Sequence, residues 1–285
     1  MTVGIGLPIG DPDLLLTWAR RADAGPFSTL GLLDRLVYDN PEPLVTLAAL
    51  AGATARIRLQ TEVLLAPLRE PALLAKQCAT LDRLSGGRFT LGVGVGGRAD
   101  DFAAAGAAVH RRGRLLDDRL AILRRTWAGE PYADGVGPIG PAPARPGGPP
   151  IVVGGFAPAA LARVARFGDG FLGAALPPAY LRRLFDEVRR TWRAAGRAGA
   201  PRLVAQVNVA LGGPATTTAA RRALTGYYAF ADYDAAAGLL TTPGEIAEAV
   251  RGYRAIGADE VMLYCWAPDP DQVDRLAEVA GPGAD

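Results

Sequence analysis

Short apolar runs alternate with amphipathic stretches along the whole chain. The clearest unit covers residues 56–97, where an apolar run at 57–65 has enough branched residues for a strand. Pro71 then suits the first turn of a helix, Gly86 and Gly87 suit its end, and residues 88–95 return as a second strand. Parallel strands joined over a helix are the unit from which wound sheets and β/α barrels are built.

Similar units follow to the end of the chain, and the number of apolar runs distinguishes between the two architectures. Eight runs are found, at residues 3–7, 29–33, 57–65, 89–95, 151–153, 170–173, 203–210 and 260–264. Eight is the number of strands in a TIM barrel. A dinucleotide-binding sheet would place a glycine fingerprint after its first strand, where this chain reads PIGDPD. The pattern predicts one α/β domain over residues 1–285, a TIM-like (β/α)8 barrel.

Two segments interrupt this rhythm. Residues 129–150, between the fourth and fifth strands, are rich in Gly and Pro without periodicity, and we interpret them as an irregular, solvated insertion. Residues 211–242, after the seventh strand, form a second insertion. It contains four aromatic residues among alanines: Tyr227, Tyr228, Phe230 and Tyr233. They either cover a substrate pocket at the carboxyl end of a strand or pack a short helix, and both interpretations stay open.

Composition limits the classes of function. The 285 residues are 49% hydrophobic and 21% charged, as in a globular protein with a substantial core. The net charge is +2 and the arginines are dispersed among acids, so we expect no nucleic-acid partner. With two cysteines, no basic region before the first apolar run and no apolar stretch of about 20 residues, we expect a cytoplasmic protein with free thiols and no membrane partner.

The chain has a single histidine, His110. Zinc sites that use several histidines and hydrolases that need a histidine pair are therefore excluded, and we predict no metal site. His110 precedes an RRGR segment and is expected at the surface or at a helix start.

Candidate site residues gather where the predicted strands end, which is where barrels bind their ligands. They are Asp34 and Arg35 after the second strand, Thr61, Glu62 and Val63 in the third, and Gly92, Gly94, Gly96 and Gly97 in the fourth. Alternating glycines allow a flat ring to approach the backbone closely, although tight inward packing or a turn explains them equally well.

A second candidate feature follows the fifth strand, where Gly154, Gly155, Phe156 and Ala157 open an apolar helix. Free amides at a helix start, beside a glycine pair, can hold a phosphate group, although the segment also fits a simple turn. Nearby arginines could supply the countercharge, and of Arg98, Arg111, Arg112 and Arg114 we expect one or two to do so, Arg98 and Arg112 first.

Four blocks give the chain a resemblance to a known family. They read RIRLQTEVLLAPLREPALLAKQCATLDRLSGGRFTLGVGVGGRADDFAAAG, RRGRLLDDRLAILRRTW, GGFAPAALARVARFGDGFLG and TPGEIAEAVRGYRAIGADEVMLY. In these blocks the chain resembles the luciferase-like family of flavin- or deazaflavin-dependent oxidoreductases. The resemblance implies a TIM-like barrel that carries reduced FMN or the deazaflavin F420, with an excursion over the pocket and often as a dimer.

The resemblance also assigns roles to residues of this chain. It implies a phosphate site at Gly154 to Ala157, ring contacts at Thr61, Glu62 and Gly94, and a non-proline cis peptide bond at Glu62-Val63. The residues expected to bind the cofactor are thus Thr61, Glu62, Val63, Gly94, Gly96, Arg98, Arg112, Gly154, Gly155, Phe156 and Ala157.

The chain departs from the family pattern at two positions. Many relatives have Asp-His where this chain has Asp34-Arg35, and a small residue where it has Glu62. Both changes place a charge near the expected ring. We therefore take Asp34, Arg35 and Glu62 as the candidate catalytic residues, for substrate orientation or proton transfer.

The preferred interpretation is a monooxygenase that uses reduced FMN and O2 on a small organic substrate, with a flavin reductase as a partner that supplies the cofactor. Two alternatives are an F420-dependent oxidoreductase that transfers hydride and a non-catalytic flavin-binding protein. The helices expected at 43–54 and 71–84 build the dimer in relatives, and their small residues Ala48, Ala51, Ala75 and Ala79 would permit close packing. The alternative is that both helices simply pack on the barrel.

Overall fold

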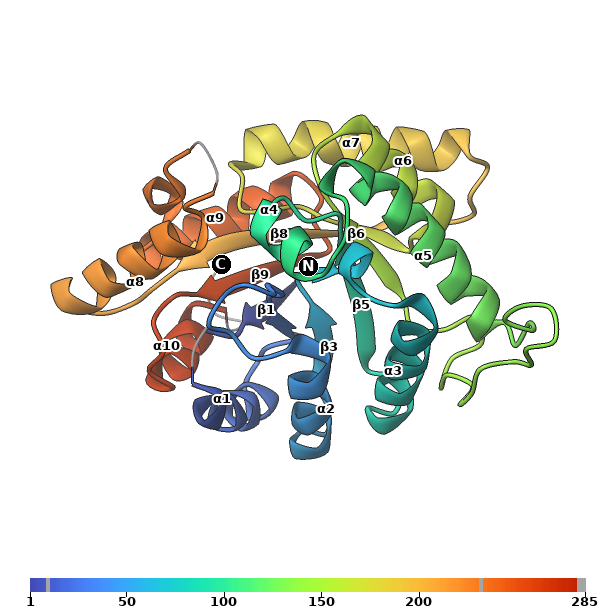
Figure 1. Cartoon of the computed structure of the whole chain (residues 1–285). Helices are drawn as coiled ribbons and strands as arrows, with labels where there is room; N and C mark the ends of the chain where they lie inside the picture. Colours follow the sequence, from blue (N-terminus) through green and yellow to red (C-terminus); the bar gives the residue numbers. More distant parts are fainter. Residues whose placement is uncertain (9–10, 231–232, 281–285) are drawn as a thin grey trace.

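The computed structural model describes residues 1–8, 11–230 and 233–280, and it shows a closed parallel barrel ringed by helices (Figure 1). The strands pair in the order β3-β2-β1-β9-β8-β7-β6-β5-β4, and β3 also pairs with β5, which closes the ring. Their bounds are β1 Thr2–Gly6, β2 Thr29–Leu32, β3 Arg58–Thr61, β4 Leu64–Leu65, β5 Phe89–Gly94, β6 Ile151–Gly154, β7 Gly170–Leu172, β8 Arg202–Val209 and β9 Glu260–Cys265. The predicted TIM-like (β/α)8 fold is confirmed.

The third barrel strand departs from the prediction of one continuous strand over 57–65. It is divided into β3, which pairs with β2 and β5, and β4, which pairs with β5. The break lies at Glu62-Val63, where the peptide bond is cis, as the resemblance implied. Counting β3 and β4 as one strand gives the eight strands of the barrel.

The helices surround the strands, and most of them begin with a proline. They are α1 Pro12–Ala24, α2 Pro43–Ala53, α3 Pro71–Leu84, α4 Ala99–Ala104, α5 Arg112–Trp127, α6 Pro158–Phe167, α7 Pro178–Ala194, α8 Pro214–Tyr227, α9 Pro243–Ala255 and α10 Asp271–Ala280, with short 3-10 turns at Ala66–Leu68, Val109–Arg111 and Ala235–Gly238. Proline suits the first helical position because its fixed φ is already helical and its missing N–H has no partner there. The strand-to-helix boundaries are therefore set locally by the sequence.

Two apolar layers hold the barrel together. The larger lies between strands and helices and includes Trp18, Phe27 and Phe89, all fully buried. A smaller cluster fills the barrel interior with Val152, Leu172, Val204 and Met262, and Val63 packs on it. The lumen is therefore solid below its carboxyl end.

The amino end of the barrel is closed by a charged cluster around Glu260, the first residue of β9. Its carboxylate accepts hydrogen bonds from Thr29 at 2.7 Å and Arg58 at 3.0 Å, and also from Arg202 and Ser28. Burial alone would raise the pKa of Glu260, but Arg202 and Arg58 hold that pKa below its usual value. Since these contacts occupy the carboxylate of Glu260, this acid is not available to a ligand. The binding site is therefore expected at the opposite end of the barrel, where the strands end.

The insertion at 129–150 joins α5 to β6, so it lies at the amino end of the barrel and away from the strand ends that build a site. Asp82 of α3 anchors it, since its Oδ2 accepts hydrogen bonds from the backbone N–H groups of Ala144 at 2.8 Å and Arg145 at 3.3 Å. In Figure 1 it extends outward beyond the end of α5. In the same view α4 lies in front of the barrel strands.

The insertion at 211–242 is largely helical. The 14-residue helix α8 occupies Pro214–Tyr227, and a 3-10 turn follows at Ala235–Gly238. The segment therefore contains a helix, which was one of the two interpretations of this insertion.

Candidate functional site

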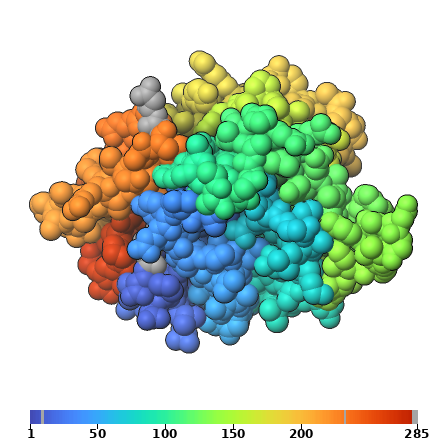
Figure 2. Space-filling view, in the orientation of Figure 1, coloured from blue at the N-terminus to red at the C-terminus, as the bar shows by residue number. Residues whose placement is uncertain are grey.

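A cavity of about 430 Å³ opens at the carboxyl ends of the strands. Residues from six of the eight barrel strands or from the loops that directly follow them contribute to its wall, together with the end of α8. Figure 2 shows the surface of α4 and α5, in green, meeting the blue surface of the segment after β2 on the same face of the molecule. The cavity is therefore the place where the barrel topology brings distant strand ends together.

Most of the predicted site residues line this cavity. They are Asp34, Arg35, Glu62, Val63, Gly94, Gly96, Arg98, Arg112, Gly154, Gly155, Phe156, Ala157, Tyr227, Tyr228 and Phe230. Thr61 and Tyr233 are not among the lining residues. Thr61 is fully buried and its hydroxyl donates to the Gly92 carbonyl at 2.7 Å, so it fixes the strand pairing. Tyr233 is 61% exposed and touches the ring of Tyr228 from outside.

Val63 and two glycines form a flat apolar floor. A Cβ atom on Gly94 would lie 2.5 Å from Val63 Cγ2, and one on Gly154 would lie 3.1 Å from Val63 Cγ1. Any side chain at Gly94 would therefore displace Val63, and the first of these distances is shorter than real carbon contacts allow. The floor leaves room for a planar ring to lie against the backbone.

The floor continues into the start of α6. Gly155 has φ of +132°, and a Cβ atom there would lie 2.8 Å from the Cβ of Ala160. Ala157 caps the helix without a side-chain hydrogen bond, so the N–H groups of the first turn have no side-chain cap. Such an end attracts anions, because the helix dipole and free N–H groups both favour negative charge.

Four arginines line the cavity, and three of them are held by carboxylates. Arg35 pairs with Asp101 at 2.9 Å, Arg98 pairs with Asp100, and Arg163 pairs with Asp117 at 2.6 Å. Arg112 lines the same cavity as the start of α6. Its Nη1 donates to the Val109 carbonyl at 3.0 Å, and no ion pair is found for it among the described residues. It is the arginine most available to an incoming anion.

Glu62 is a buried acid of the cavity with a free carboxyl oxygen. Gln60 Nε2 donates to its Oε1 at 2.6 Å, while its Oε2 is buried and has no partner among the described residues. Burial raises the pKa of Glu62 to about 8, and the negative charge of Glu260 acts in the same direction. The side chain therefore carries a proton at neutral pH, and its unpartnered Oε2 can donate that proton in a hydrogen bond.

Asp34 has a structural task. Its Oδ2 accepts hydrogen bonds from the backbone N–H of Leu65 at 2.8 Å and from Arg69 at 3.0 Å, which ties the end of β2 to the third barrel strand. Burial raises the pKa of Asp34, and the positive charge of Arg69 opposes that rise. This oxygen is thus occupied by protein groups.

The aromatic residues at the end of α8 both pack a helix and line the cavity, so the two interpretations of this insertion hold together. Tyr227 is the last residue of α8 and packs edge-on against Tyr38 at 5.3 Å and Tyr228 at 5.0 Å. Tyr228 and Phe230 stack at an interplanar angle of 25°. Tyr227, Tyr228 and Phe230 therefore end the helix and also line the cavity.

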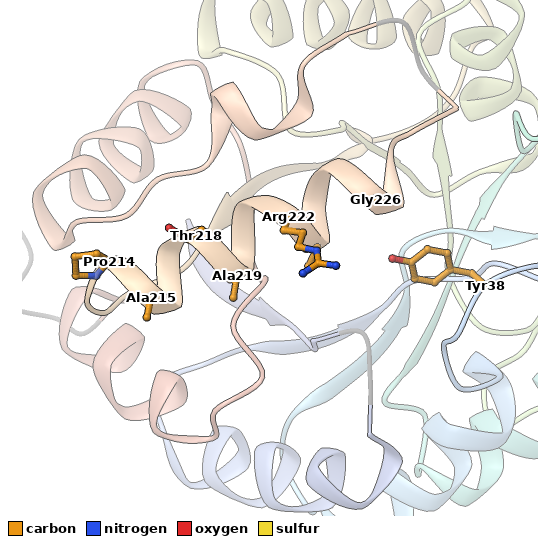
Figure 3. Close-up of a pocket in the computed structure, with 8 residues that line it drawn as sticks. Tyr38, Pro214, Ala215, Thr218, Ala219, Arg222 and Gly226 are labelled. Carbon is orange, nitrogen blue, oxygen red and sulfur yellow. The ribbon is translucent and has the colours of Figure 1, made fainter.

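A larger hollow, of about 720 Å³, lies outside the barrel (Figure 3). It is a shallow groove along the outer face of α8, lined by small residues such as Ala215, Ala219 and Gly226, with Arg222 and the ring of Tyr38. It does not contain the acids and glycines described above. We place the functional site in the smaller cavity for that reason.

Three charged or polar lining residues were not predicted from the sequence: Asp101, Arg163 and Gln206. Asp101 is buried on α4 and also accepts hydrogen bonds from the backbone of Leu36 and Val37. Asp101 lies only three residues after the predicted Arg98, but its ion-pair partner Arg35 lies 66 residues away in the sequence. Such a pairing needs the folded barrel to be recognised.

Neither a membrane-spanning helix nor a metal site is found in the described part of the chain. No helix there combines the length and hydropathy needed to cross a membrane. No group of three or more His, Cys, Asp or Glu side chains there could hold a metal ion. His110 is exposed in the turn before α5, as expected, and both cysteines are buried free thiols.

The sequence matches the luciferase-like monooxygenase family over residues 3–282. The chain belongs to this family. An uncharacterized protein of Mycobacterium tuberculosis is 38% identical over 163 residues, which is 55% of this chain and 56% of that protein. The chain therefore matches little more than half the length of this curated relative.

Three solved structures share the whole fold. Monooxygenase RslO1 from Streptomyces bottropensis has a TM-score of 0.78 at 22% identity, covering 98% of this chain and 97% of that one. An F420-dependent secondary alcohol dehydrogenase, in complex with an F420-acetone adduct, has a TM-score of 0.81 at 17% identity and full coverage of both chains. The oxygenating constituent of 3,6-diketocamphane monooxygenase from Pseudomonas putida, in complex with FMN, has a TM-score of 0.75 at 17% identity, covering 98% and 95%. At these identities the likeness shows the fold.

Proposed function

We propose that this protein is a monooxygenase that uses reduced FMN and O2 to oxidise an organic substrate. The observation that carries the proposal is the flat floor of Val63 and Gly94, which runs through Gly154 into the uncapped start of α6. A planar ring and a phosphate at one end of it are the two parts that FMN would place there.

The residues present fit such a group. Val63 and Gly94 would support the ring, and a Cβ at Gly94 is incompatible with the position of Val63. Gly155, Phe156 and Ala157 would hold the phosphate at the helix start, with Arg112 as countercharge. Reduced FMN, when bound, would supply the electrons with which O2 is activated for insertion into the substrate.

The chain's own groups bind, orient and exclude water. Glu62 holds a proton, and its free Oε2 can donate a hydrogen bond within the cavity. Tyr227, Tyr228 and Phe230 cover the opening with apolar rings, which keeps water from the reacting atoms. The site thus relies on positioning and on a protonated acid, without a histidine.

F420 is the second candidate cofactor. Its acidic tail would need several cations at the cavity mouth, and the arginines there favour it in number. Three of the four are already paired with carboxylates, however, and the single available Arg112 matches the single phosphate of FMN. The full-length structural likeness to an F420-dependent dehydrogenase keeps this candidate in the test.

Anaerobic titration of the purified protein with reduced FMN and, separately, with reduced F420 tests the proposal. We expect saturable binding of FMN and weak binding of F420. Tight binding of F420 without affinity for FMN would replace oxygen insertion by hydride transfer. Substrate-dependent O2 consumption above the free-flavin background would then separate an enzyme from a non-catalytic flavin carrier.

A further inference from the structure

Arg35 is a buried cation with an unused donor. Only 7% of the residue is exposed, its Nε donates to Asp101 Oδ2 at 2.9 Å, and its Nη1 donates to the Tyr227 carbonyl at 3.2 Å. Its Nη2 is buried and has no hydrogen-bond partner among the described residues. Buried donors are nearly always paired in folded proteins, because leaving one unpaired forfeits its hydration. This nitrogen is thus expected to meet a group that the protein itself does not supply.

The surroundings prevent Arg35 from turning to find another partner. Its guanidinium carbon lies 5.4 Å from the ring centre of Tyr38, 5.1 Å from that of Tyr227 and 5.5 Å from that of Phe230. Asp101 does not serve Nη2 as well, since its Oδ1 accepts two backbone N–H groups, its Oδ2 accepts from Nε, and Nη2 has no partner among the described residues. The rings and the carboxylate therefore fix the plane of the guanidinium.

Arg35 lies away from the phosphate site. It follows β2, and two barrel strands, the β3/β4 strand and β5, separate β2 from β6 in the ring. The phosphate site lies at the end of β6 and the start of α6 and has its own cation, Arg112. Arg35 itself lines the cavity, so its unpartnered Nη2 offers the cavity a donor that is separate from Arg112.

We propose that Arg35 is the specificity-determining residue of this site and that its Nη2 binds an oxygen-centred anion of the substrate. The inference rests on the proposed function for the position of the cofactor. The substrate class is an apolar, ring-bearing molecule with an acidic oxygen, such as a carboxylate or an ionised enol. The anion pairs with Arg35, while the rings of Tyr228 and Phe230 contact the apolar body.

A pair of probes that differ only in charge tests this assignment. Calorimetric titration of the FMN-loaded protein with 2-naphthoate and with 2-naphthamide measures how much a carboxylate gains over a neutral amide of the same shape. We expect naphthoate to bind about tenfold more tightly, as is typical of a charge-assisted hydrogen bond. Equal affinity for the two probes in the wild-type protein would overturn the proposal.

Two variants assign the preference to Arg35. In Arg35→Gln the buried Asp101 keeps its charge and repels the anion, so naphthoate should bind more weakly than naphthamide. In the double variant Arg35→Gln/Asp101→Asn both charges are removed, which protects folding, and the probes should bind alike. Arg125→Gln is the control, since Arg125 is an exposed arginine on α5 that pairs with Glu130 outside the cavity.

The two proposals fail in different ways. If wild-type protein does not bind FMN, the proposed function is overturned. If FMN binds normally to the double variant and naphthoate is still preferred about tenfold, only the role of Arg35 is overturned.

Discussion

At the scale of single residues, the cavity is built from groups whose environment changes their chemistry. Glu62 is a buried acid, and the next residue, Val63, packs on the apolar cluster that fills the barrel interior. Gly31 of β2 makes room for Glu62, since a Cβ there would lie 2.7 Å from its carboxyl carbon. The environment therefore favours the neutral form of this side chain.

The raised pKa of Glu62 predicts a stability change with pH. The unfolded chain releases this proton near its usual value of 4.5, whereas the folded protein retains it to about 8. The folded state thus binds more protons in that window, and the stability contributed by the neutral form is lost as pH rises to about 8. Glu62→Gln should remove this dependence, and chemical denaturation at pH 5 and pH 9 measures it.

The expected magnitude follows from the shift. One pH unit corresponds to about 1.4 kcal/mol, so Glu62→Gln should be a few kcal/mol more stable than the wild type at pH 9 and nearly equal at pH 5. Equal stability changes at both pH values would show that Glu62 ionises normally.

Gly94 gives a second prediction at this scale. Gly94→Ala forces its Cβ into Val63, so we expect a loss of stability of about 1–3 kcal/mol and a loss of FMN binding as the floor is displaced. Fluorescence titration with FMN and thermal unfolding measure the two effects. Gly52→Ala is the control, because no atom lies within 4 Å of the added Cβ on α2. Normal FMN affinity in Gly94→Ala would contradict the assigned floor.

At the scale of elements, the local sequence predicted most of the fold. It did not predict which of the two insertions contributes to the cavity. Apolar runs, helix-starting prolines and glycine stops are local signals, and they located all eight barrel strands. The segment 129–150 follows a helix and precedes a strand, so it lies at the amino end of the barrel. A helix in the segment 211–242 was predicted only as one of two alternatives, because the alanines and threonines of α8 give few large apolar positions from which to judge the periodicity.

The position of residues 129–150 predicts that they can be altered without effect on the site. Replacing residues 134–141 by a short Gly-Ser linker should leave FMN affinity within about twofold, because the anchor at Ala144 and Arg145 is preserved. Titration with FMN is the measurement. A loss of affinity of tenfold or more would place this segment over the cavity after all.

The same contrast holds for the site. Candidate residues at strand ends could be named from the sequence because parallel strands bring their carboxyl ends together. Asp101 and Arg163 could not, since their ion pairs with Arg35 and Asp117 join elements that are far apart in the chain. Thr61 was assigned by resemblance, yet its hydroxyl is bound to Gly92.

At the scale of the whole molecule, self-association stays a prediction, but the residues expected to mediate it are different from those named from the sequence. Ala51, Ala75 and Ala79 are buried within the protomer, and Ala48 packs partly on its core, so these alanines serve the packing of α2 and α3 on the barrel. The large apolar residues that are exposed on these helices are Val45 at 68%, Leu73 at 55% and Leu84 at 62%. They are the ones available to a second copy.

A dimer through α2 and α3 predicts the effect of Val45→Glu. The wild type should have twice the mass of a monomer in light scattering, and Val45→Glu should shift it to the monomer without a change in thermal stability, because Val45 contributes little to the core. A monomeric wild type, or a variant that remains dimeric, would exclude this interface.

The central claim is that one continuous surface, from Val63 and Gly94 to the start of α6, holds a planar phosphorylated redox cofactor. A crystal structure of the protein with FMN tests it most directly. The account predicts the phosphate at the N–H groups that follow Gly155, with Arg112 turned toward it, and the ring against Val63. A phosphate bound elsewhere, or a ring that does not touch the floor, would contradict it.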